Sequence, residues 1–472
     1  MFVRNDASRD VRVRREAVSL AAAGYRVTIV ALAARSSGLP ERDGFDGVAI
    51  VRVLPPSAWR KRWEDVRDHP WRARHWIGPA LRSRRWRPAD MPAGLAIGLL
   101  LVAAVPWTLV RAAQRLVKGP RPRVEHEHDD VWDWLVRWQF SILGWADSAA
   151  AVAPPADVYH GHDLNALPAA VRAADRHGGR VVYDSHELFL ESGTTARQPG
   201  WARRIVGRRE GRWARRSAAV VTVNESIATE LRRRYRVRET VVVRNCPPRR
   251  TGPIEEAVPR AAIGPLRAAI GATAAQPIVL YHGGFQRDRG LDRLADAILT
   301  SGLEAVSLIY LGFGPERESL ERLVSEPRFG GRIHVLPAVP SDELLDWVAD
   351  ADVAAMPNQP VTLNERYSTP NKLFESIAAG TPVVSSDTPE RRQIVLDDPL
   401  GPLGVVCDPT DPASIGAAIR SLVEAPEAER AAIRARCRRA ARERLNWETE
   451  AALLIELYQR LAPSGRVADD GH

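Results

Sequence analysis

The sequence predicts two parallel α/β domains in tandem, because apolar strands alternate with helical stretches twice along the chain. One alternation runs from Asp157 to the segment TVVVRN, and a second begins at Pro277. Helical stretches of about 10 to 15 residues between strands are typical of parallel βαβ units. A chain of 472 residues is also too long for one hydrophobic core. We therefore expect two doubly wound sheets, whose ligands bind beyond the carboxyl ends of the strands.

The first domain is expected over residues 1–248. It opens with a helix that Asp10 caps and Gly24 ends, followed by a strand from Arg26 to Leu32. Because only Met1 to Arg4 precede this helix, either the first strand is short or the true start lies upstream. Later strands are expected at DVYHGH, RVVYDSH, AAVVTV and TVVVRN, and the last helix runs from Asn224 to Tyr235.

The second domain is expected over residues 249–440, after the proline-rich linker CPPRRTGPIEEAVPR. Its strands are predicted at PIVLYHG, VSLIYLG, RIHVL, DVAAMP, TPVVSS and GPLGVV. Residues 441–472 contain a helix that we expect to return to the first domain.

Residues 55–150 depart from the alternation and are predicted to form a helical insertion rich in tryptophan and arginine. Ten of the 14 tryptophans lie between Trp59 and Trp145, and Met91 to Val110 carries no charge. One interpretation is a helical insertion packed on the first domain. The other, which the tryptophans and arginines beside the apolar segment favour, is contact with a membrane. Pro92 and Pro106 make a full span the weaker alternative.

Charge and cysteine content narrow the partners and the compartment. The net charge of +9 favours an anionic partner, such as a phosphorylated substrate, an acidic lipid or a nucleic acid. The three cysteines have no paired spacing, which fits a reducing compartment and argues against a disulfide framework or a cysteine-type zinc site. With no cleavable signal peptide at the start, we expect a cytoplasmic protein.

The stretch STPNKLFESIAAGTPVVSSDTPE, from Ser368 to Glu390, predicts an anion-binding helix. Ser368 and Thr369 are N-cap residue types, and proline suits the first helical turn. The N–H groups at such a helix start, with Lys372 beside them, can bind a phosphate. A carboxylate one turn further in, Glu375, can accept hydrogen bonds from a ribose. The alternative is an ordinary capped helix with a surface lysine–glutamate pair.

This stretch resembles the donor-binding signature of glycosyltransferase family 4, a retaining family with the GT-B fold. The resemblance extends over most of the chain outside residues 55–150, through RVRREAVSLAAAGYRVTIVAL, DVYHGHDLNALPAA, VVYDSHELF, VVTVNESIA, VVVRNCP and IVLYHGGFQRDRGLDRL. It implies a nucleotide-sugar donor held mainly by the second domain, an acceptor met by the first, and no need for a metal or another cofactor.

The resemblance also implies roles for individual residues. The donor-binding residues would be Gly283, Gly284, Gly314, Ser368, Thr369, Pro370, Asn371 and Glu375. The catalytic residues would be His162, Arg289 and Lys372, and the acceptor side would include His186 and Glu187. Three positions depart from the family pattern: the first of its two glutamates is Tyr367 here, an arginine position is Gly284, and a lysine position is Arg289. These departures leave the sugar identity and the catalytic detail open.

Other motifs carry weaker signals. Gly312 and Gly314 follow a strand, but Arg317 replaces the third glycine of a dinucleotide fingerprint. His160 and His162 alone are poor support for a metal site. The segment HELFL lacks the second histidine of a zinc-protease motif. The segment HEHDD, residues 126–130, is expected to be a solvated loop, and Asn224 in the sequon NES is expected to cap a helix.

The function predicted from the sequence is a retaining glycosyltransferase of polysaccharide or envelope biosynthesis. It would act on a glycan or lipid-linked acceptor at the inner face of the membrane, as a peripheral or monotopic protein. Two alternatives remain: a nucleotide-sugar epimerase on the same fold, and a catalytically degenerate, membrane-associated assembly protein. Nucleic-acid binding is not expected, because no recognised module appears. The sequence does not identify the sugar, the base or the acceptor.

Overall fold

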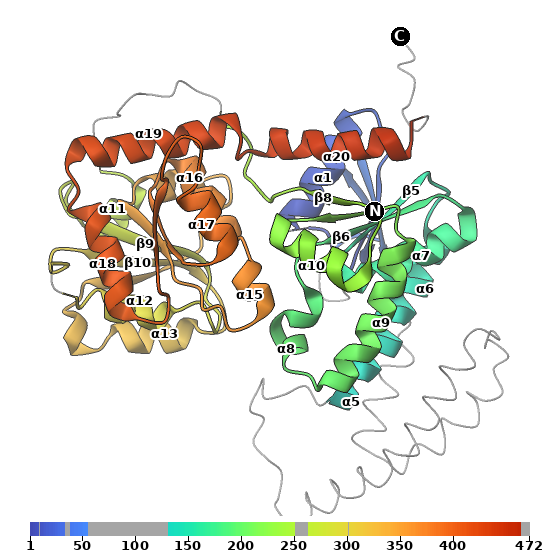
Figure 1. The fold of residues 1–472 in the computed structure, drawn as a ribbon, viewed down its shortest axis with the longest axis horizontal. Helices are drawn as coiled ribbons and strands as arrows, with labels where there is room; N and C mark the ends of the chain where they lie inside the picture. Colours follow the sequence, from blue (N-terminus) through green and yellow to red (C-terminus); the bar gives the residue numbers. More distant parts are fainter. Residues whose placement is uncertain (9, 34–37, 55–130, 251–262, 301, 464–472) are drawn as a thin grey trace, which may run out of the picture.

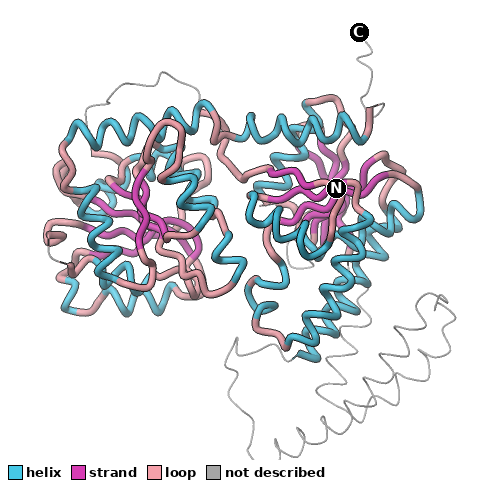
Figure 2. The backbone as a smooth tube through the Cα atoms, viewed as in Figure 1, coloured by secondary structure: helices cyan, strands magenta, loops and turns pink. Residues whose placement is uncertain are grey.

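The protein consists of two α/β domains that lie side by side (Figure 1). The computed structural model describes residues 1–8, 10–33, 38–54, 131–250, 263–300 and 302–463. Strands lie at the centre of each domain and helices surround them (Figure 2). The predicted apolar segment Met91 to Val110 and the segment HEHDD lie outside the described residues. The architecture confirms the expected tandem of doubly wound domains, which is the GT-B arrangement.

The N-terminal sheet has eight strands in the order β3-β4-β2-β1-β5-β6-β7-β8. Their bounds are Phe2–Val3 (β1), Thr28–Leu32 (β2), Arg42–Phe45 (β3), Val48–Val53 (β4), Val158–His162 (β5), Arg180–Ser185 (β6), Ala219–Thr222 (β7) and Thr240–Val242 (β8). The first strand is indeed short, and it pairs in parallel with β2 and β5 in the middle of the sheet. Only β3 and β4 pair in antiparallel fashion within this described sheet.

The β3–β4 hairpin was not predicted. Asp46 and Gly47 form its two-residue turn with φ angles of 45° and 77°. Both residues therefore adopt the left-handed conformation that an Asp-Gly hairpin turn requires.

The helices of this domain cover both faces of the sheet. Their bounds are Val11–Ala22 (α1), Val131–Val136 (α5), Arg137–Ile142 (η3, a π-helix), Leu143–Val152 (α6), Asp163–His177 (α7), Phe189–Glu191 (η4), Gly193–Ala196 (α8), Gly200–Arg216 (α9) and Glu225–Tyr235 (α10). Asp10 caps α1 and Asn224 caps α10 through side-chain hydrogen bonds, as predicted. Trp134, Trp138 and Trp145 are buried in the core cluster of this domain. These three tryptophans therefore pack within the protein and are not interfacial anchors.

The C-terminal sheet has six parallel strands in the order β11-β10-β9-β12-β13-β14. The strands are Ile278–Gly284 (β9), Ser307–Phe313 (β10), Ile333–Pro337 (β11), Val353–Met356 (β12), Val383–Ser386 (β13) and Gly404–Cys407 (β14). The helices around them are Pro265–Ile270 (α11), Leu291–Ala297 (α12), Arg317–Val324 (α13), Pro327–Phe329 (η5), Leu344–Ala349 (α14), Leu363–Tyr367 (α15), Asn371–Ala379 (α16), Pro389–Val395 (α17), Pro412–Val423 (α18) and Glu427–Glu443 (α19).

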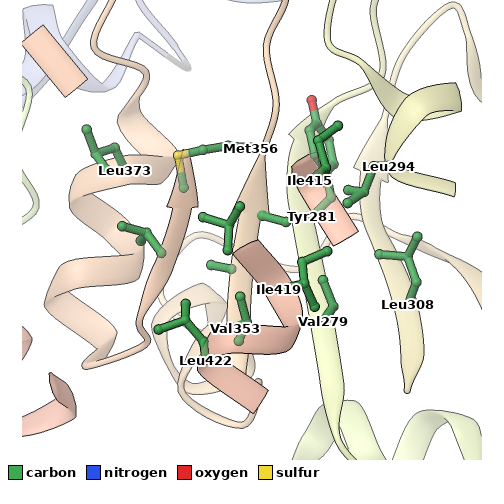
Figure 3. Packing of buried hydrophobic residues seen from close by; sticks show 14 of the residues in the cluster. Val279, Tyr281, Leu294, Leu308, Val353, Met356, Leu373, Ile415, Ile419 and Leu422 are labelled. Carbon is green, nitrogen blue, oxygen red and sulfur yellow. The ribbon is translucent and has the colours of Figure 1, made fainter. Parts of the chain in front are cut away.

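A large apolar core holds the helices of the C-terminal domain on its sheet. In Figure 3, side chains from α18 meet side chains from β9, β10 and β12, and Leu373 of α16 lies on the other side of Met356. Because Leu373 is fully buried next to the exposed Asn371, this packing fixes the start of α16 at the surface of the domain.

A final helix, Trp447–Leu461 (α20), packs on α1 of the N-terminal domain. Figure 1 shows α19 on one domain and α20 on the other. The Trp447 indole donates a hydrogen bond to Ser19 Oγ at 2.9 Å, and Leu454 and Leu457 are fully buried. Among the described residues, no helix combines the length and the apolar character needed to cross a bilayer.

Candidate active site

A cavity of about 620 Å³ lies between the two domains. Its lining from the N-terminal domain includes Asn5, Asp6, Asp10, Val11, Arg12, His186, Glu187, Val223, Ile227 and Asn245. Its lining from the C-terminal domain includes Arg289, Asn364, Glu365, Ser368, Thr369, Pro370 and Asn371. The structure thus brings seven predicted site residues to one cavity: His186, Glu187, Arg289 and the four residues 368–371.

The start of helix α16 is open toward this cavity. Pro370 is the N-cap residue, and no side chain accepts a hydrogen bond from the first turn. The prediction that Ser368 or Thr369 caps the helix is therefore wrong. Ser368 Oγ instead donates to Glu365 O at 3.1 Å and accepts from Arg391 Nη2 at 2.8 Å. Leu373 N donates to Pro370 O at 2.9 Å, so the N–H groups of Asn371 and Lys372 are the ones that could bind an anion, which the helix dipole favours at this end.

Lys372 lies beside this helix start, under the end of β9. Its Nζ sits 3.5 Å from the centroid of the Tyr281 ring. A Cβ built on Gly283 would lie 3.7 Å from that Nζ, and the φ of 105° at Gly283 favours glycine. Burial and the nearby Arg289 guanidinium hold the pKa of Lys372 well below its usual value. An anion in this position would restore the charge of the lysine.

Arg289 reaches the cavity from the loop after β9. Its Nη1 is 3.2 Å from Glu365 Oε2, and its Nη2 donates to Gln286 Oε1 at 3.3 Å. Sequence reasoning missed Glu365, which lies two residues before Tyr367, the position at which the family carries a glutamate. Tyr367 itself packs against the core of the N-terminal domain. The cleft therefore does contain a carboxylate from this segment, and it is paired with the predicted catalytic arginine.

Glu375 lies near the end of β9, outside the set of residues that line the cavity. Its Oε2 is 3.0 Å from His282 Nε2, and its side chain is 26% exposed. The glutamate is accessible to a ligand, but one of its two oxygens already has a partner. His282 is a second residue that sequence reasoning missed.

The glycines at the end of β10, Gly312 within the strand and Gly314 directly after it, are required by close backbone contacts that do not involve a ligand. A Cβ on Gly314 would lie 2.2 Å from Phe285 O, at a φ of 150°. A Cβ on Gly312 would lie 1.9 Å from Gly283 O. By contrast, the nearest atom to a Cβ on Gly284 is Gln286 Nε2 at 3.6 Å, which is an ordinary contact. Gly314 thus keeps two backbone segments together, whereas Gly284 has room for a side chain.

On the N-terminal wall of the cavity, two carboxylates contact His186 and favour its protonated form. His186 Nε2 lies 2.8 Å from Asp184 Oδ2, and Nδ1 lies 3.4 Å from Asp163 Oδ2. Although burial opposes the charge, these two carboxylates raise the pKa of His186 to about 10. Both ring nitrogens face carboxylates, so His186 is poorly placed to act as a general base. Burial and repulsion from Asp163 raise the pKa of the neighbouring Glu187.

The structure corrects the expected position of His162. The residue is only 1% exposed and lies beneath the cavity wall, with Nδ1 3.1 Å from Asp184 Oδ2. Its ring stacks on that of His160 at a centroid distance of 4.4 Å, and His160 Nδ1 is 2.9 Å from the Tyr458 hydroxyl of α20. Burial lowers the pKa of both histidines. In this position, His162 contacts Asp184 Oδ2, the same oxygen that contacts His186, and so helps to hold Asp184 in place beside His186.

Four buried side chains bring potential metal ligands within 4.8 Å of one another: Glu16, His160, His162 and Asp184. Arg12 already occupies this cluster, with Nε and Nη2 at 3.0 and 2.9 Å from the two Asp184 oxygens and Nε at 3.0 Å from Glu16 Oε1. Asp184 Oδ2 also faces His162 and His186. Burial and the Asp184 charge raise the pKa of Glu16 to about 8, so that its proton offsets part of the negative charge. These contacts fit a charge network better than a metal centre.

Hydrogen bonds across the domains hold the cavity walls together. Leu188 N donates to Asn364 Oδ1 at 2.9 Å, and Asn224 Nδ2 donates to Tyr367 O at 2.8 Å. A third bond joins Asn245 Nδ2 to Asn371 Oδ1 at 3.0 Å. The helix start that could hold an anion therefore faces the N-terminal wall directly.

Two family models match the chain, one in each domain. Residues 113–246 match the model described as Glycosyltransferase Family 4, and residues 276–425 match the one described as Glycosyl transferases group 1. The chain is a family 4 glycosyltransferase. Both matches contain residues that line the cavity, such as His186 in the first match and Arg289 in the second.

Curated relatives support the same assignment. A D-inositol 3-phosphate glycosyltransferase of Xylanimonas cellulosilytica is 33% identical over 197 residues, or 41% of this chain and 44% of the relative. A GDP-mannose-dependent alpha-(1-6)-phosphatidylinositol dimannoside mannosyltransferase of Mycobacterium tuberculosis is 30% identical over 42% of this chain and 48% of the relative. The chain thus aligns with about half the length of these two relatives.

Solved structures show the fold. A sucrose-phosphate synthase from Thermosynechococcus elongatus superposes with a TM-score of 0.64 and 17% identity, over 97% of this chain and 94% of that one. A protein of Anabaena in complex with UDP-glucose, HepE, gives a TM-score of 0.52 with 16% identity, over 69% and 84% of the two chains. These matches confirm the GT-B fold, and no relative named here supports the epimerase alternative.

Proposed function

We propose that this family 4 glycosyltransferase moves a sugar from a nucleotide sugar to an acceptor in the interdomain cavity, with retention of the anomeric configuration. The observation that carries the proposal is the start of α16. Its first turn lacks a side-chain cap, and Lys372 and Arg289 stand next to it. A helix N-terminus with two cations is suited to the diphosphate of the donor.

In the proposed reaction, the bond between the sugar and the diphosphate breaks, and negative charge develops on the diphosphate. Lys372, Arg289 and the helix start would stabilise that charge electrostatically. An acceptor hydroxyl would bond to the anomeric carbon from the face that the diphosphate leaves, and a diphosphate oxygen would take the hydroxyl proton. We assign no covalent nucleophile, because Glu365 is paired with Arg289. No divalent metal is required in this scheme.

The acceptor would meet the wall that carries His186 and Glu187. We propose a glycan, a lipid-linked sugar or another envelope acceptor. His186 would contribute a positive charge and Glu187 a hydrogen-bond acceptor. Glu187 Oε1 already accepts from Ser192 Oγ at 2.7 Å, which fixes the carboxyl group in place.

We also propose that the enzyme works in the cytoplasm, on the inner face of the membrane, with Met91 to Val110 contributing to contact with lipid. This segment lies outside the described residues, and the support is its uncharged sequence. Deleting residues 91–110 should lower co-sedimentation with anionic vesicles while donor binding persists. Unchanged co-sedimentation of the folded deletion variant would refute the contribution of this segment.

The experiment that tests the proposed function is a thermal-shift panel of nucleotide sugars, followed by a transfer assay. UDP-glucose and GDP-mannose are suitable first probes, because one structural neighbour was solved in complex with UDP-glucose and one relative is named as GDP-mannose-dependent. A bound donor raises the melting temperature by mass action. A donor that stabilises the protein should also yield a transferred sugar of unchanged anomeric configuration. Inversion of that configuration would contradict the mechanism.

A further inference from the structure

Helix α9 carries an exposed stripe that combines arginines with large apolar side chains. Trp201 is 45% exposed and Ile205 is 40% exposed. The stripe continues through Arg204, Arg208, Arg212 and Arg215, all exposed. These positions recur every three or four residues and therefore lie on one face of the helix. We call this set of six residues the α9 stripe.

The opposite face of α9 is the one that packs on the domain. Ala202, Val206 and Ala214 are buried there. The one carboxylate of the helix, Glu210, is also buried, and it accepts hydrogen bonds from the hydroxyls of Tyr183 and Tyr235 at 2.9 and 2.6 Å. The α9 stripe thus contains no acidic side chain of its own helix.

The arginines of the α9 stripe differ from other arginines of the same helix in their ion pairs with the described residues. No carboxylate of the described residues forms an ion pair with Arg204, Arg208, Arg212 or Arg215. The contrast lies within the same helix, where Arg203 pairs with Glu191 at 2.7 Å and Arg216 pairs with Asp175. Four arginines on one helix face, without an ion-pair partner in the part of the chain that the structure describes, favour an anionic partner.

We propose that the α9 stripe docks the enzyme on the surface of an anionic lipid bilayer. Both lipid and nucleic acid are anionic partners, and the exposed side chains of Trp201 and Ile205 favour lipid. An exposed indole and an exposed aliphatic side chain gain by entering the boundary between headgroups and acyl chains. Phosphate contacts alone would give Ile205 no such gain. Arginines can keep their stems along this apolar surface while their guanidinium groups reach lipid phosphates.

The stripe begins close to the cleft. Arg197, three residues before α9, has Nη2 3.7 Å from Asp288 Oδ2, and Asp288 precedes Arg289 in the sequence. Figure 1 shows α8, directly before α9, on the side of the N-terminal domain that faces the C-terminal domain. A bilayer on the α9 stripe would therefore lie near one rim of the cavity, where a lipid-linked acceptor could enter. This proposal is independent of the nature of the donor and of the segment 91–110.

The test is co-sedimentation of the full chain with phosphatidylcholine vesicles that contain or lack phosphatidylglycerol. Wild type should pellet with the anionic vesicles only, and R208Q/R212Q should lower the partition coefficient about thirtyfold. The matched control is R439Q/R442Q, which removes the same charge from two exposed positions of α19, a helix of the same 17-residue length. The control should bind as wild type, and W201A should bind more weakly.

Each alternative outcome overturns the proposal. If the α9 and α19 variants lose equal binding, overall charge explains the attraction. If R208Q/R212Q binds vesicles as wild type does, the stripe is not a lipid surface. If R208Q/R212Q loses binding to single-stranded RNA but not to vesicles, the stripe is a nucleic-acid surface. Melting temperatures of all variants confirm folding, and the thermal shift with UDP-glucose or GDP-mannose reports donor binding separately.

Discussion

Replacing Glu375 by alanine should weaken the binding of the donor nucleoside by about tenfold to about a hundredfold. The size follows from the geometry, because Glu375 Oε2 already faces His282 Nε2 at 3.0 Å and leaves Oε1 for a ribose hydroxyl. One hydrogen bond to a charged acceptor contributes about 1.5–3 kcal/mol. The spacing in the sequence had suggested two such bonds. With the side chain 26% exposed, we expect the lower half of the range.

Titration calorimetry with a nucleoside and with the corresponding nucleoside diphosphate checks this prediction. Both ligands should lose affinity by the same factor, since both contain the ribose. Glu375→Gln should lose less, because its amide oxygen still accepts a hydrogen bond. Glu318→Ala, an exposed carboxylate on α13, is the control and should change nothing. The assignment fails if Glu375→Ala binds the nucleoside like wild type, or if only the diphosphate form binds more weakly.

Three further predictions concern the donor site and the buried network. Because burial lowers the pKa of Lys372, wild-type affinity for a nucleotide sugar should fall as the pH rises through that lowered pKa. Lys372→Gln should give a flatter profile of affinity against pH in calorimetry. If the slope of that profile is the same in the variant, Lys372 does not bind the donor as a cation. Gly314→Ala should lower the free energy of unfolding by about 2 kcal/mol or more, because its Cβ would lie 2.2 Å from Phe285 O; urea unfolding at wild-type denaturant concentrations would disprove this. The pKa of Glu16 is raised from 4.5 to about 8, so between these pH values the folded state binds more protons than the unfolded state. The stability that Glu16 contributes is therefore fully present below pH 4.5 and is lost as the pH rises through about 8. Glu16→Gln should therefore gain stability relative to wild type between pH 5 and pH 9, by about 1.4 kcal/mol for each unit of the pKa shift, and parallel stability curves would contradict the raised pKa.

Much of the architecture could be predicted, because local patterns determine it. The strands of both sheets appear in the sequence as apolar runs, and Asp10 and Asn224 cap helices by contacts within three residues. The β3–β4 hairpin, which was not predicted, also has a local signal in its Asp-Gly turn. Where one residue and its neighbours decide the outcome, sequence patterns were sufficient.

The site was less predictable, because its contacts join distant segments. His160 and His162 alternate with Gly161 and so share one face of β5, but which face is buried depends on α1 and α20, hundreds of residues apart. Glu365 has no motif of its own, and only the fold places it 3.2 Å from Arg289. The capping signal at Ser368 failed for a similar reason, since Arg391 engages that hydroxyl from α17.

The central claim is that the start of α16, with Lys372 and Arg289, holds the donor diphosphate. The most direct test is the ratio of the affinities for a nucleoside diphosphate and its nucleoside, measured by calorimetry on wild type, Lys372→Gln and Arg289→Gln. We predict that wild type binds the diphosphate form at least about tenfold more tightly, and that each variant reduces this ratio while its affinity for the nucleoside stays unchanged. Equal affinity of wild type for the two ligands, or a ratio that neither substitution alters, would contradict the claim.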